Sequence, residues 1–430
     1  MTRALIDDCF VTNADRMLHA DAIALLQARV ACVAGVERVA LVHAQARVLA
    51  QAAIARMPVP AHTNAAVDGY SFAVADAALA VSDGLLIDGR AAAGHALTGH
   101  RPAHSAARIF TGAVVPAGHD TVAMQEDCER FAIQGQMFVR IPAGLKRGGN
   151  VRQAGEDVAA GTTLIAPGAV LRPQDVAALA SIGLGEVEVF KRLRVAILSS
   201  GDEVVAPGQG LAPGQVYDAN APMLQGLIGL ASAETTTLGV AGDTAAALEA
   251  QLLSAAKNFD VIITSGGASQ GEEDHLARAL DRLGKRHLWQ LAIKPGRPMM
   301  FGQIGAKDHD CVIVGLPGNP VAVFVCFLMY VMPVLRKLGG APWREPRRWL
   351  LPAAFEMASR KTGRREFWRG MLVERDGQML AEKFARDGSG LISGLRAADG
   401  LIEVEEGVTA IRRGDPVRFM PFTEFGLPAS

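Results

Sequence analysis

The sequence predicts a multidomain α/β protein with a doubly wound α/β domain near its centre. The chain has 430 residues, which is more than one ordinary hydrophobic core holds. Between residues 194 and 339, short apolar strands alternate with amphipathic helices, the order expected of a parallel sheet covered on both faces. On both sides of this segment, short alternating runs separated by glycines indicate β structure.

The composition restricts the classes of partner. Half of the residues are hydrophobic, a fifth are charged and the formal net charge is −1. These values suit a globular protein and provide no overall field toward nucleic acid or an anionic membrane. Aromatic residues make up only 5% of the chain, which disfavours a base-stacking surface. We therefore expect small-molecule substrates, with no nucleic acid and no membrane partner.

The cysteines and the N-terminus favour a cytoplasmic protein. Five cysteines are scattered without a C-x-x-C pair, which argues against a zinc site and suits a reducing compartment. Cys311 and Cys326 stand in apolar runs and are expected to be inert core residues. Residues 1–8 carry charges and lack the apolar segment of a signal peptide.

The helices and strands expected before the central segment follow from the local composition and from the prolines that begin or end them. Residues 21–55 are rich in Ala, Leu and Val and predict a long helix, ended by Pro58 and Pro60. Alternating runs at 85–87, 107–110 and 137–141 predict a mostly β module. A further helix is expected over 175–182, with Pro173 at its start.

The central segment predicts strands at 195–198, 235–240, 261–264, 287–293 and 312–314, and helices at 222–231, 244–256, 272–283 and 320–338. Leu276, Ala279, Leu280 and Leu283 share one helix face. The apolar run 321–335 is too short to span a membrane and contains Pro333, so we expect a buried helix. The predicted domains are a helical/mixed linker domain (1–56 plus 144–190), a mostly β lid module (57–143), the α/β domain (191–340) and a C-terminal β-barrel-like domain (341–430).

A glycine loop at residues 264–271 is the first candidate site. It follows a buried strand and precedes a helix, so backbone N–H groups and the helix N-terminus can hold a phosphate. Gly266 and Gly267 permit close approach, and Ser265 and Ser269 offer hydroxyl donors. No Gly-Lys-Ser/Thr follows, so the loop is not a Walker A motif. The alternative is a tight strand–helix turn.

Three acids also follow predicted strand ends: Glu203, Asp243 and Asp274. Carboxyl ends of parallel strands share one edge of a sheet, so these acids are expected to converge there. Carboxylates beside a phosphate predict Mg²⁺. The alternative for Asp243 is a helix N-cap. Nearby, Lys294 ends a strand before a proline-rich turn and can clamp an oxyanion, unless it is only a solvated turn charge.

Several motifs occur in a fixed order, at residues 66–70, 108–113, 150–157, 200–203, 265–274, 293–298 and 315–320. This ordered set resembles the molybdopterin molybdenumtransferase family, called MoeA in bacteria and the gephyrin E domain in animals. The resemblance covers about residues 22–422. It implies that adenylated molybdopterin and molybdate react to give molybdenum cofactor and AMP, with a divalent cation, usually Mg²⁺. It also implies a homodimer with its active site between subunits, and transient contact with molybdopterin adenylyltransferase and molybdoenzymes.

The resemblance assigns site roles by position. The positions expected to be catalytic are Asp68, Thr111, Asp157, Glu203, Asp243 and Asp274, of which the last three form the metal site. The positions that the resemblance assigns to binding of the pterin substrate or molybdate are Lys294, Pro317, Pro320, Arg364 and Ser389. The glycine loop adds Ser265, Gly266, Gly267 and Ser269 as expected phosphate-binding residues. Lys294, Arg364 and Ser389 are expected near molybdate.

The sequence departs from this family at Gln290, where a lysine is usual, so the oxyanion neighbourhood loses one positive charge. Two other functions fit parts of the pattern. A molybdopterin adenylyltransferase shares the α/β domain, but the additional modules argue against it. A non-catalytic scaffold of the same fold has no need of the intact acid set.

Overall fold

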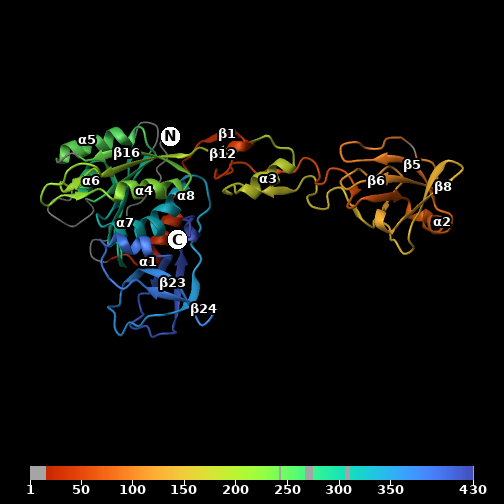
Figure 1. Cartoon of the computed structure of the whole chain (residues 1–430). Helices are drawn as coiled ribbons and strands as arrows, with labels where there is room; N and C mark the ends of the chain where they lie inside the picture. The colour runs from red at the N-terminus through yellow and green to blue at the C-terminus, as the bar shows by residue number, and fades with distance from the viewer. Residues whose placement is uncertain (1–15, 100, 242–243, 267–274, 306–309, 430) are drawn as a thin grey trace.

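The computed structural model describes residues 16–99, 101–241, 244–266, 275–305 and 310–429. The molecule is elongated (Figure 1). The α/β domain and the C-terminal domain form a body, a slender linker module extends from it, and a β-rich lobe stands at the far end.

The linker module joins two segments that are distant in the sequence. Strand β1 (Val36–Ala40) pairs antiparallel with β12 (Glu186–Phe190), and β2 (Ala53–Ile54) pairs with β11 (Thr163–Ile165). Helix α3 (Pro173–Ser181) begins at its proline, which confirms the helix predicted there.

The helix predicted over residues 21–55 is wrong. Helix α1 (His19–Arg29) ends before β1, which begins directly after Gly35. The valines at 30, 33, 36 and 39 favour extended structure, and pairing with β12 settles the outcome. High alanine content alone suggested a continuous helix, but helix propensity is a weak constraint that tertiary pairing overrides.

The lobe is built on a sheet with the order β7-β4-β6-β5-β9-β8. Its strands are β4 (Gly69–Phe72), β5 (Leu85–Ala91), β6 (Ser105–Ile109), β7 (Thr121–Met124), β8 (Glu129–Ile133) and β9 (Gln136–Arg140), with the short helix α2 (Ala77–Ser82). The three runs predicted as strands lie in β5, β6 and β9. Where the lobe meets the linker, β3 (Asn64–Ala65) pairs with β10 (Val151–Arg152).

The α/β domain contains a sheet with the order β16-β13-β17-β21-β20-β18. Its strands are β13 (Leu193–Ser199), β16 (Ala233–Val240), β17 (Val261–Ser265), β18 (Gly284–Gln290), β20 (Pro298–Gly305) and β21 (Asp310–Leu316). A small parallel pair, β14 (Val204–Val205) with β15 (Val216–Tyr217), stands outside this sheet. The first four strands of the sheet are parallel, as predicted, whereas β20 and β18 are antiparallel to their neighbours. Strand β20 was not predicted, because it begins at a proline directly after a turn. The single strand predicted at 287–293 is divided between β18 and β19 (Ile293–Lys294).

Both faces of this sheet are covered. Val195 and Ile197 of β13 pack in a core with α4 (Asn220–Gly229) and the helical segment 320–338, whereas Ala196 and Leu198 pack in a core with α5 (Ala245–Ala256) and α6 (His275–Leu283). Successive residues of a strand point to opposite faces, so one apolar strand serves both cores. The doubly wound arrangement is therefore confirmed.

The segment 320–338 forms a continuous helix composed of α7 (Pro320–Cys326), a π turn (Phe327–Val331) and α8 (Met332–Leu338). It is long and apolar enough to cross a membrane, but 89% of its apolar window is buried inside the protein. It is a core helix, as predicted. Cys311 and Cys326 are fully buried, and burial raises the pKa of both thiols, so they are inert at neutral pH.

The C-terminal domain is mainly β. Its strands are β22 (Trp349–Pro352), β23 (Arg365–Arg375), β24 (Gln378–Lys383), β25 (Gly400–Val404) and β26 (Pro416–Pro421), with the short helix α9 (Ile392–Ala397). The sheet runs β19-β23-β25-β26-β22, and β24 adds to β23. A bridge between Ala353 and Ala381 joins the β22 end to β24, which makes the sheet barrel-like. Strand β19 pairs with β23 and ties this domain to the α/β domain.

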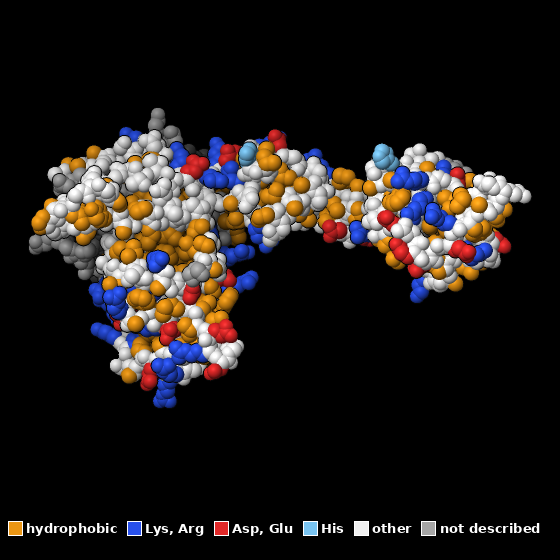
Figure 2. All heavy atoms as spheres, in the orientation of Figure 1, with side chains coloured by type: hydrophobic (Ala, Val, Ile, Leu, Met, Phe, Trp, Pro, Cys, Tyr) orange, Lys and Arg blue, Asp and Glu red, His pale blue; other side chains and the backbone are white. Residues whose placement is uncertain are grey.

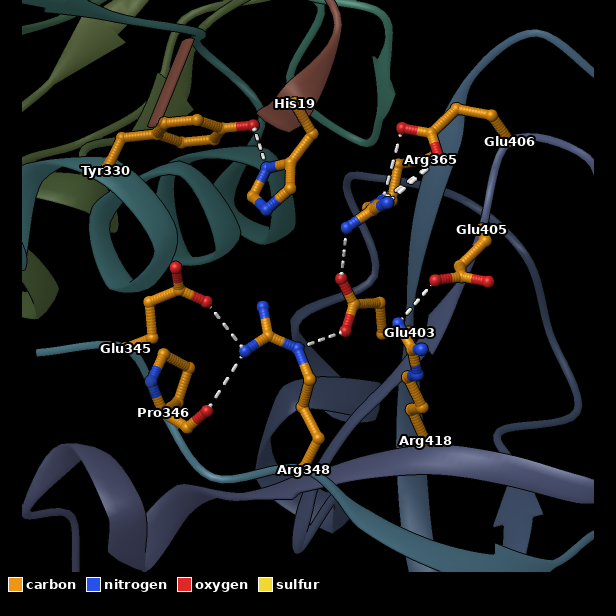
Figure 3. Close-up of polar contacts among 10 residues, drawn as sticks. All are labelled: His19, Tyr330, Glu345, Pro346, Arg348, Arg365, Glu403, Glu405, Glu406 and Arg418. Atoms are coloured by element: carbon orange, nitrogen blue, oxygen red, sulfur yellow. Dashed lines mark hydrogen bonds and ion pairs between the residues drawn. The ribbon is translucent and has the colours of Figure 1, made fainter. Parts of the chain in front are cut away.

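A polar network lies where α1, the core helix and the C-terminal sheet meet (Figure 3). The Nδ1 atom of His19 is 2.7 Å from the hydroxyl of Tyr330. Beside this pair, Arg365 bridges Glu403 and Glu406, and the side chain of Glu403 is completely buried. The network therefore connects three elements that are distant in the sequence.

Candidate active site

The loops that carry the three predicted acids begin side by side. Ser199, at the carboxyl end of β13, lies opposite both Val240 of β16 and Ser265 of β17. The amide of Ser200 also donates to the carbonyl of Ser265 at 2.9 Å. Glu203 follows β13 and is exposed, whereas Asp243 and Asp274 lie outside the described residues. The strand ends that precede all three acids therefore meet at one edge of the sheet.

The N-terminus of α5 excludes one alternative for Asp243. The N-cap residue is Thr244, whose hydroxyl accepts a hydrogen bond from the amide of Ala247 at 3.2 Å. The interpretation of Asp243 as the helix N-cap is therefore wrong, because the neighbouring threonine performs that role.

The glycine loop starts in a tightly restricted geometry. Gly266 has φ +89°, and a Cβ atom there would lie 2.4 Å from the carbonyl oxygen of Ser200. Only glycine fits such a position. Ser265 is buried, and its Oγ accepts a hydrogen bond from Asn220 at 2.7 Å. The predicted loop residues Gly267 and Ser269 lie outside the described residues.

Asn220 is a rim residue that the sequence analysis missed. Its Nδ2 atom donates both to the Oγ of Ser265 and to the carbonyl of Gly318, each at 2.7 Å. It thereby connects the loop after β17 with the loop after β21. Its Oδ1 is buried and has no hydrogen-bond partner among the described residues. The sequence signal, an Asp-x-Asn before a helix, indicates capping equally well: the carboxylate of Asp218 accepts from two amides there.

A cavity of about 490 Å³ lies between this rim and the C-terminal domain. Three of the predicted residues line it: Lys294, Pro317 and Ser389. Pro320, the first residue of α7, is not among the lining residues, although Val321 directly after it is. The amide of Val321 donates to the carbonyl of Ser389 at 3.0 Å, which fixes the serine loop to the start of the helix.

The arginine that lines the cavity is Arg369, not the predicted Arg364. Arg364 directs its Nε to the carboxylate of Glu366 at 2.9 Å. Arg369 is buried and donates to the carbonyls of Leu391 and Arg386 at 2.8 and 2.7 Å. Several arginines stand between residues 360 and 369. Only the register of β23 determines which of them faces the cavity, and the sequence does not reveal that register.

The charge of Lys294 has a buried partner. Its Nζ lies 3.9 Å from Oε2 of Glu366, which also accepts a hydrogen bond from the indole of Trp368 at 2.8 Å. Burial alone would raise the pKa of Glu366, but the hydrogen bonds from Trp368 and Arg364 outweigh it and the pKa is lowered. The carboxylate is therefore ionised at neutral pH and lies beside the ammonium group of Lys294 at the cavity.

The predicted residues of the lobe form a separate group. Oδ1 of Asp68 accepts from the amide and the hydroxyl of Thr111, both at 2.8 Å, and these bonds lower its pKa. Asp157 is exposed, and its amide donates to the carbonyl of Val59 in the connection to the linker. The lobe stands at the opposite end of the molecule from the body (Figure 1). One chain therefore does not bring Asp68 and Thr111 to Lys294.

The fold and the site define a multidomain α/β protein with a cavity, lined by three cationic side chains, that lies where its parallel strands end and a second domain adjoins them. The sequence matches, in order, the MoeA N-terminal region (domain I and II) over residues 17–183, a probable molybdopterin binding domain over 196–337 and the MoeA C-terminal region (domain IV) over 351–422. The chain belongs to the molybdopterin molybdenumtransferase family, MoeA.

Individual relatives agree with this assignment. A molybdopterin molybdenumtransferase of Haemophilus influenzae is 34% identical over 87% of this chain and 91% of its own length. One from Bacillus subtilis is 28% identical over 90% of both chains. The crystal structure of a molybdopterin biosynthesis MoeA protein from Pyrococcus horikoshii has a TM-score of 0.79 at 30% identity, covering 95% of this chain and 99% of that chain.

Proposed function

We propose that this protein inserts molybdenum into adenylated molybdopterin, consuming molybdate and releasing AMP and molybdenum cofactor. The observation that supports this most directly is the cation-lined cavity beside the glycine loop. The loop holds the pterin phosphate at the strand ends, and the adjoining cavity holds molybdate near the dithiolene. The two dithiolene sulfurs displace two oxygens from molybdate; one oxygen passes to the pterin phosphate as the phosphoanhydride bond breaks and AMP leaves, and the other leaves as water. The protein contributes positioning and charge neutralisation.

The residues of the cavity divide this work. Lys294 and Ser389 hold molybdate, and Arg369 takes the place that the sequence analysis gave to Arg364. Gly266 allows the chain to approach the phosphate, and Asn220 keeps Ser265 and the opposite rim at a fixed separation. These roles follow from the lining of the cavity and from the hydrogen bonds across the rim.

We propose Mg²⁺ as the divalent cation, held by Glu203, Asp243 and Asp274. The side-by-side strand ends that precede these residues support the fit, and hard carboxylate oxygens are the ligands that Mg²⁺ prefers. Within the described residues no group of three or more His, Cys, Asp or Glu forms a metal site, so this site depends on the two acids beyond them. When bound, the ion neutralises charge on the phosphoanhydride.

We also propose a homodimer in the cytoplasm. The lobe that carries Asp68 and Thr111 is remote from its own cavity, so a complete site requires the lobe of a second chain (Figure 1). Hydrophobic side chains gather on the body where the α/β domain meets the C-terminal domain, a surface suited to a partner subunit (Figure 2). Transient contacts with molybdopterin adenylyltransferase and molybdoenzymes, and the four-domain division given above, belong to the same proposal.

Molybdate-dependent release of AMP from adenylated molybdopterin tests the proposed reaction. We expect release only when molybdate is present, loss of release after chelation of divalent cations, and a strong decrease for Asp274→Ala. Transfer of AMP from ATP onto molybdopterin would instead indicate an adenylyltransferase. Binding of adenylated molybdopterin with no turnover under any of these conditions would indicate a scaffold.

Mixing two inactive variants tests the shared site. Asp68→Ala and Lys294→Gln should each abolish most activity, because each removes one half of the site. If the site lies between subunits of a homodimer, an equal mixture that exchanges subunits should regain roughly a quarter of wild-type activity, since half of the dimers carry one intact site of two. A mixture as inactive as its components would contradict the shared site.

A further inference from the structure

The C-terminal wall of the cavity carries a lysine, Lys383, whose side chain is largely buried and has two neighbouring partners. Lys383 ends β24 and lines the cavity together with Lys294 and Arg369. Its Nζ is 2.7 Å from Oδ1 of Asp387 and 5.3 Å from the centre of the Trp368 ring. Only 21% of the side chain is exposed. An ammonium group held between a carboxylate and an aromatic face has a defined position before any ligand arrives.

The positive charges of the cavity all lower the pKa of one carboxyl group, that of Asp387. Three cations and one acid, Asp387, are the charged residues of its lining. The hydrogen bond from Lys383 lowers the pKa of Asp387 most. The positive charges of Lys383, Lys294 and Arg369 lower it further, whereas partial burial opposes them. A potential that stabilises this carboxylate also favours an incoming oxyanion.

The three cations differ in the donors that they can offer. Arg369 donates to two backbone carbonyls and therefore supports the loop that carries Ser389. Lys383 donates one hydrogen bond to Asp387, and an ammonium group has three donors, so two are left for a ligand. Lys383 and Lys294 line the same cavity from different domains, which makes the cavity suited to a small tetrahedral anion.

The neutral residue Gln290 stands where a second lysine is usual, so another residue must supply that positive charge if the cavity is to have two lysines. Gln290 is not among the residues that line the cavity, and its carbonyl accepts a hydrogen bond from Met17 at 3.0 Å. We propose that Lys383 contacts the molybdate oxyanion directly and supplies the second lysine charge that Gln290 does not provide. This inference rests on the proposed function and adds a substrate-binding residue to it.

Binding of molybdate alone tests the inference without the pterin substrate. Equilibrium dialysis with molybdenum analysis should show that Lys383→Gln weakens molybdate binding on the order of ten- to a hundredfold, the range of a lost charge-assisted hydrogen bond. Lys383→Arg should retain part of the affinity. In turnover, KM for molybdate should rise more than kcat falls. Lys257→Gln, at an exposed lysine at the end of α5, is the matched control and should bind molybdate as the wild type does.

Asp387→Asn separates contact from support. Removing a negative charge beside a bound anion should leave molybdate binding unchanged or strengthen it. If Asp387→Asn weakened binding as much as Lys383→Gln, the pair would be a structural clamp and direct contact would be excluded. Unchanged molybdate affinity in Lys383→Gln would also overturn the inference. If the wild type bound molybdate but released no AMP, the proposed reaction would fail while the binding result still decided the role of Lys383.

Discussion

The side chains of Asn220 and Ser265, together with Gly266, fix the edge of the sheet where the substrate is expected. Asn220 holds Ser265 and Gly318 at hydrogen-bond distance from one amide nitrogen. Gly266 brings the next turn of chain against the carbonyl of Ser200. Because these contacts join loops that follow three different strands, a change at one residue is transmitted to the whole rim.

Gly266→Ala should therefore be more harmful than an ordinary glycine substitution. The methyl group would be strained by the positive φ and would also meet the Ser200 carbonyl, at 2.4 Å. We expect a loss of unfolding free energy of about 1–3 kcal/mol and at least a tenfold decrease in AMP release. Urea unfolding and turnover measure the two effects.

The matched control is Gly208→Ala. Gly208 has φ +92°, but a Cβ atom there meets nothing within 4 Å. This variant should show only the cost of positive φ, about 1 kcal/mol, and should keep its activity. Equal losses of activity in both variants would mean that the close approach to Ser200 has no part in forming the site.

At single positions, the sequence indicates which types of residue the site needs better than it indicates which residue of that type lines the cavity. The cavity is lined by Lys294 and Ser389, which the resemblance assigned to the substrate, and by Arg369, whereas Arg364 lies outside the lining. Asn220 and Lys383 were missed because neither stands in one of the motifs used to find the site. Whether such a side chain faces a cavity depends on strand register and domain docking, which are properties of the folded chain.

Among the elements, those with two-sided burial were predicted best. Strands β13, β17 and β21 are buried over most of their length and mainly apolar, so their number and parallel order follow from hydrophobic runs between helices. Strand β1 was missed because its burial pattern alternates only between exposed and half-buried. It is stabilised by pairing with β12, about 150 residues away along the chain, and no local pattern reports such a partner.

The core helix, residues 320–338, positions parts of the molecule outside itself. Its N-terminus contributes Val321 to the cavity and fixes the loop of Ser389, while its π turn places Tyr330 against His19. One buried element thus connects the cavity with the N-terminal segment and the C-terminal sheet. Its length and apolarity were evident from the sequence, but these contacts required the assembled domains.

For the whole molecule, shape has a functional consequence that the amino-acid pattern does not contain. The linker module keeps the lobe away from the body, so residues assigned to one site lie at opposite ends of a chain (Figure 1). Motif order predicts that Asp68 and Lys294 belong to the same reaction. The separation of the lobe from the body within one chain supports the proposal that these residues meet across two chains.

The junction of the body domains should respond to acid through His19. Burial, followed by the positive charge of Arg365, lowers the pKa of His19 from 6.5 to about 4. The charges of Arg348 act in the same direction, and those of Glu403 and Glu406 oppose it. Between these two pKa values the unfolded chain binds a proton that the folded chain does not. The contribution of this group to stability is therefore constant above about pH 6.5 and decreases as the pH falls toward 4.

His19→Gln should remove this dependence while keeping a polar partner for the hydroxyl of Tyr330. We expect the wild type to lose about 1 kcal/mol of unfolding free energy relative to His19→Gln between pH 7 and pH 5.5, because one proton is taken up on unfolding. Urea unfolding of both proteins at each pH measures the difference in unfolding free energy. The contributions of the other titrating groups are the same in both proteins and are removed by the subtraction. The exposed His43→Gln variant should follow the wild type. A difference between wild type and His19→Gln that stays constant over this range would show that His19 is not kept neutral at the domain junction, because a neutral buried histidine must give up stability as the unfolded chain takes up its proton.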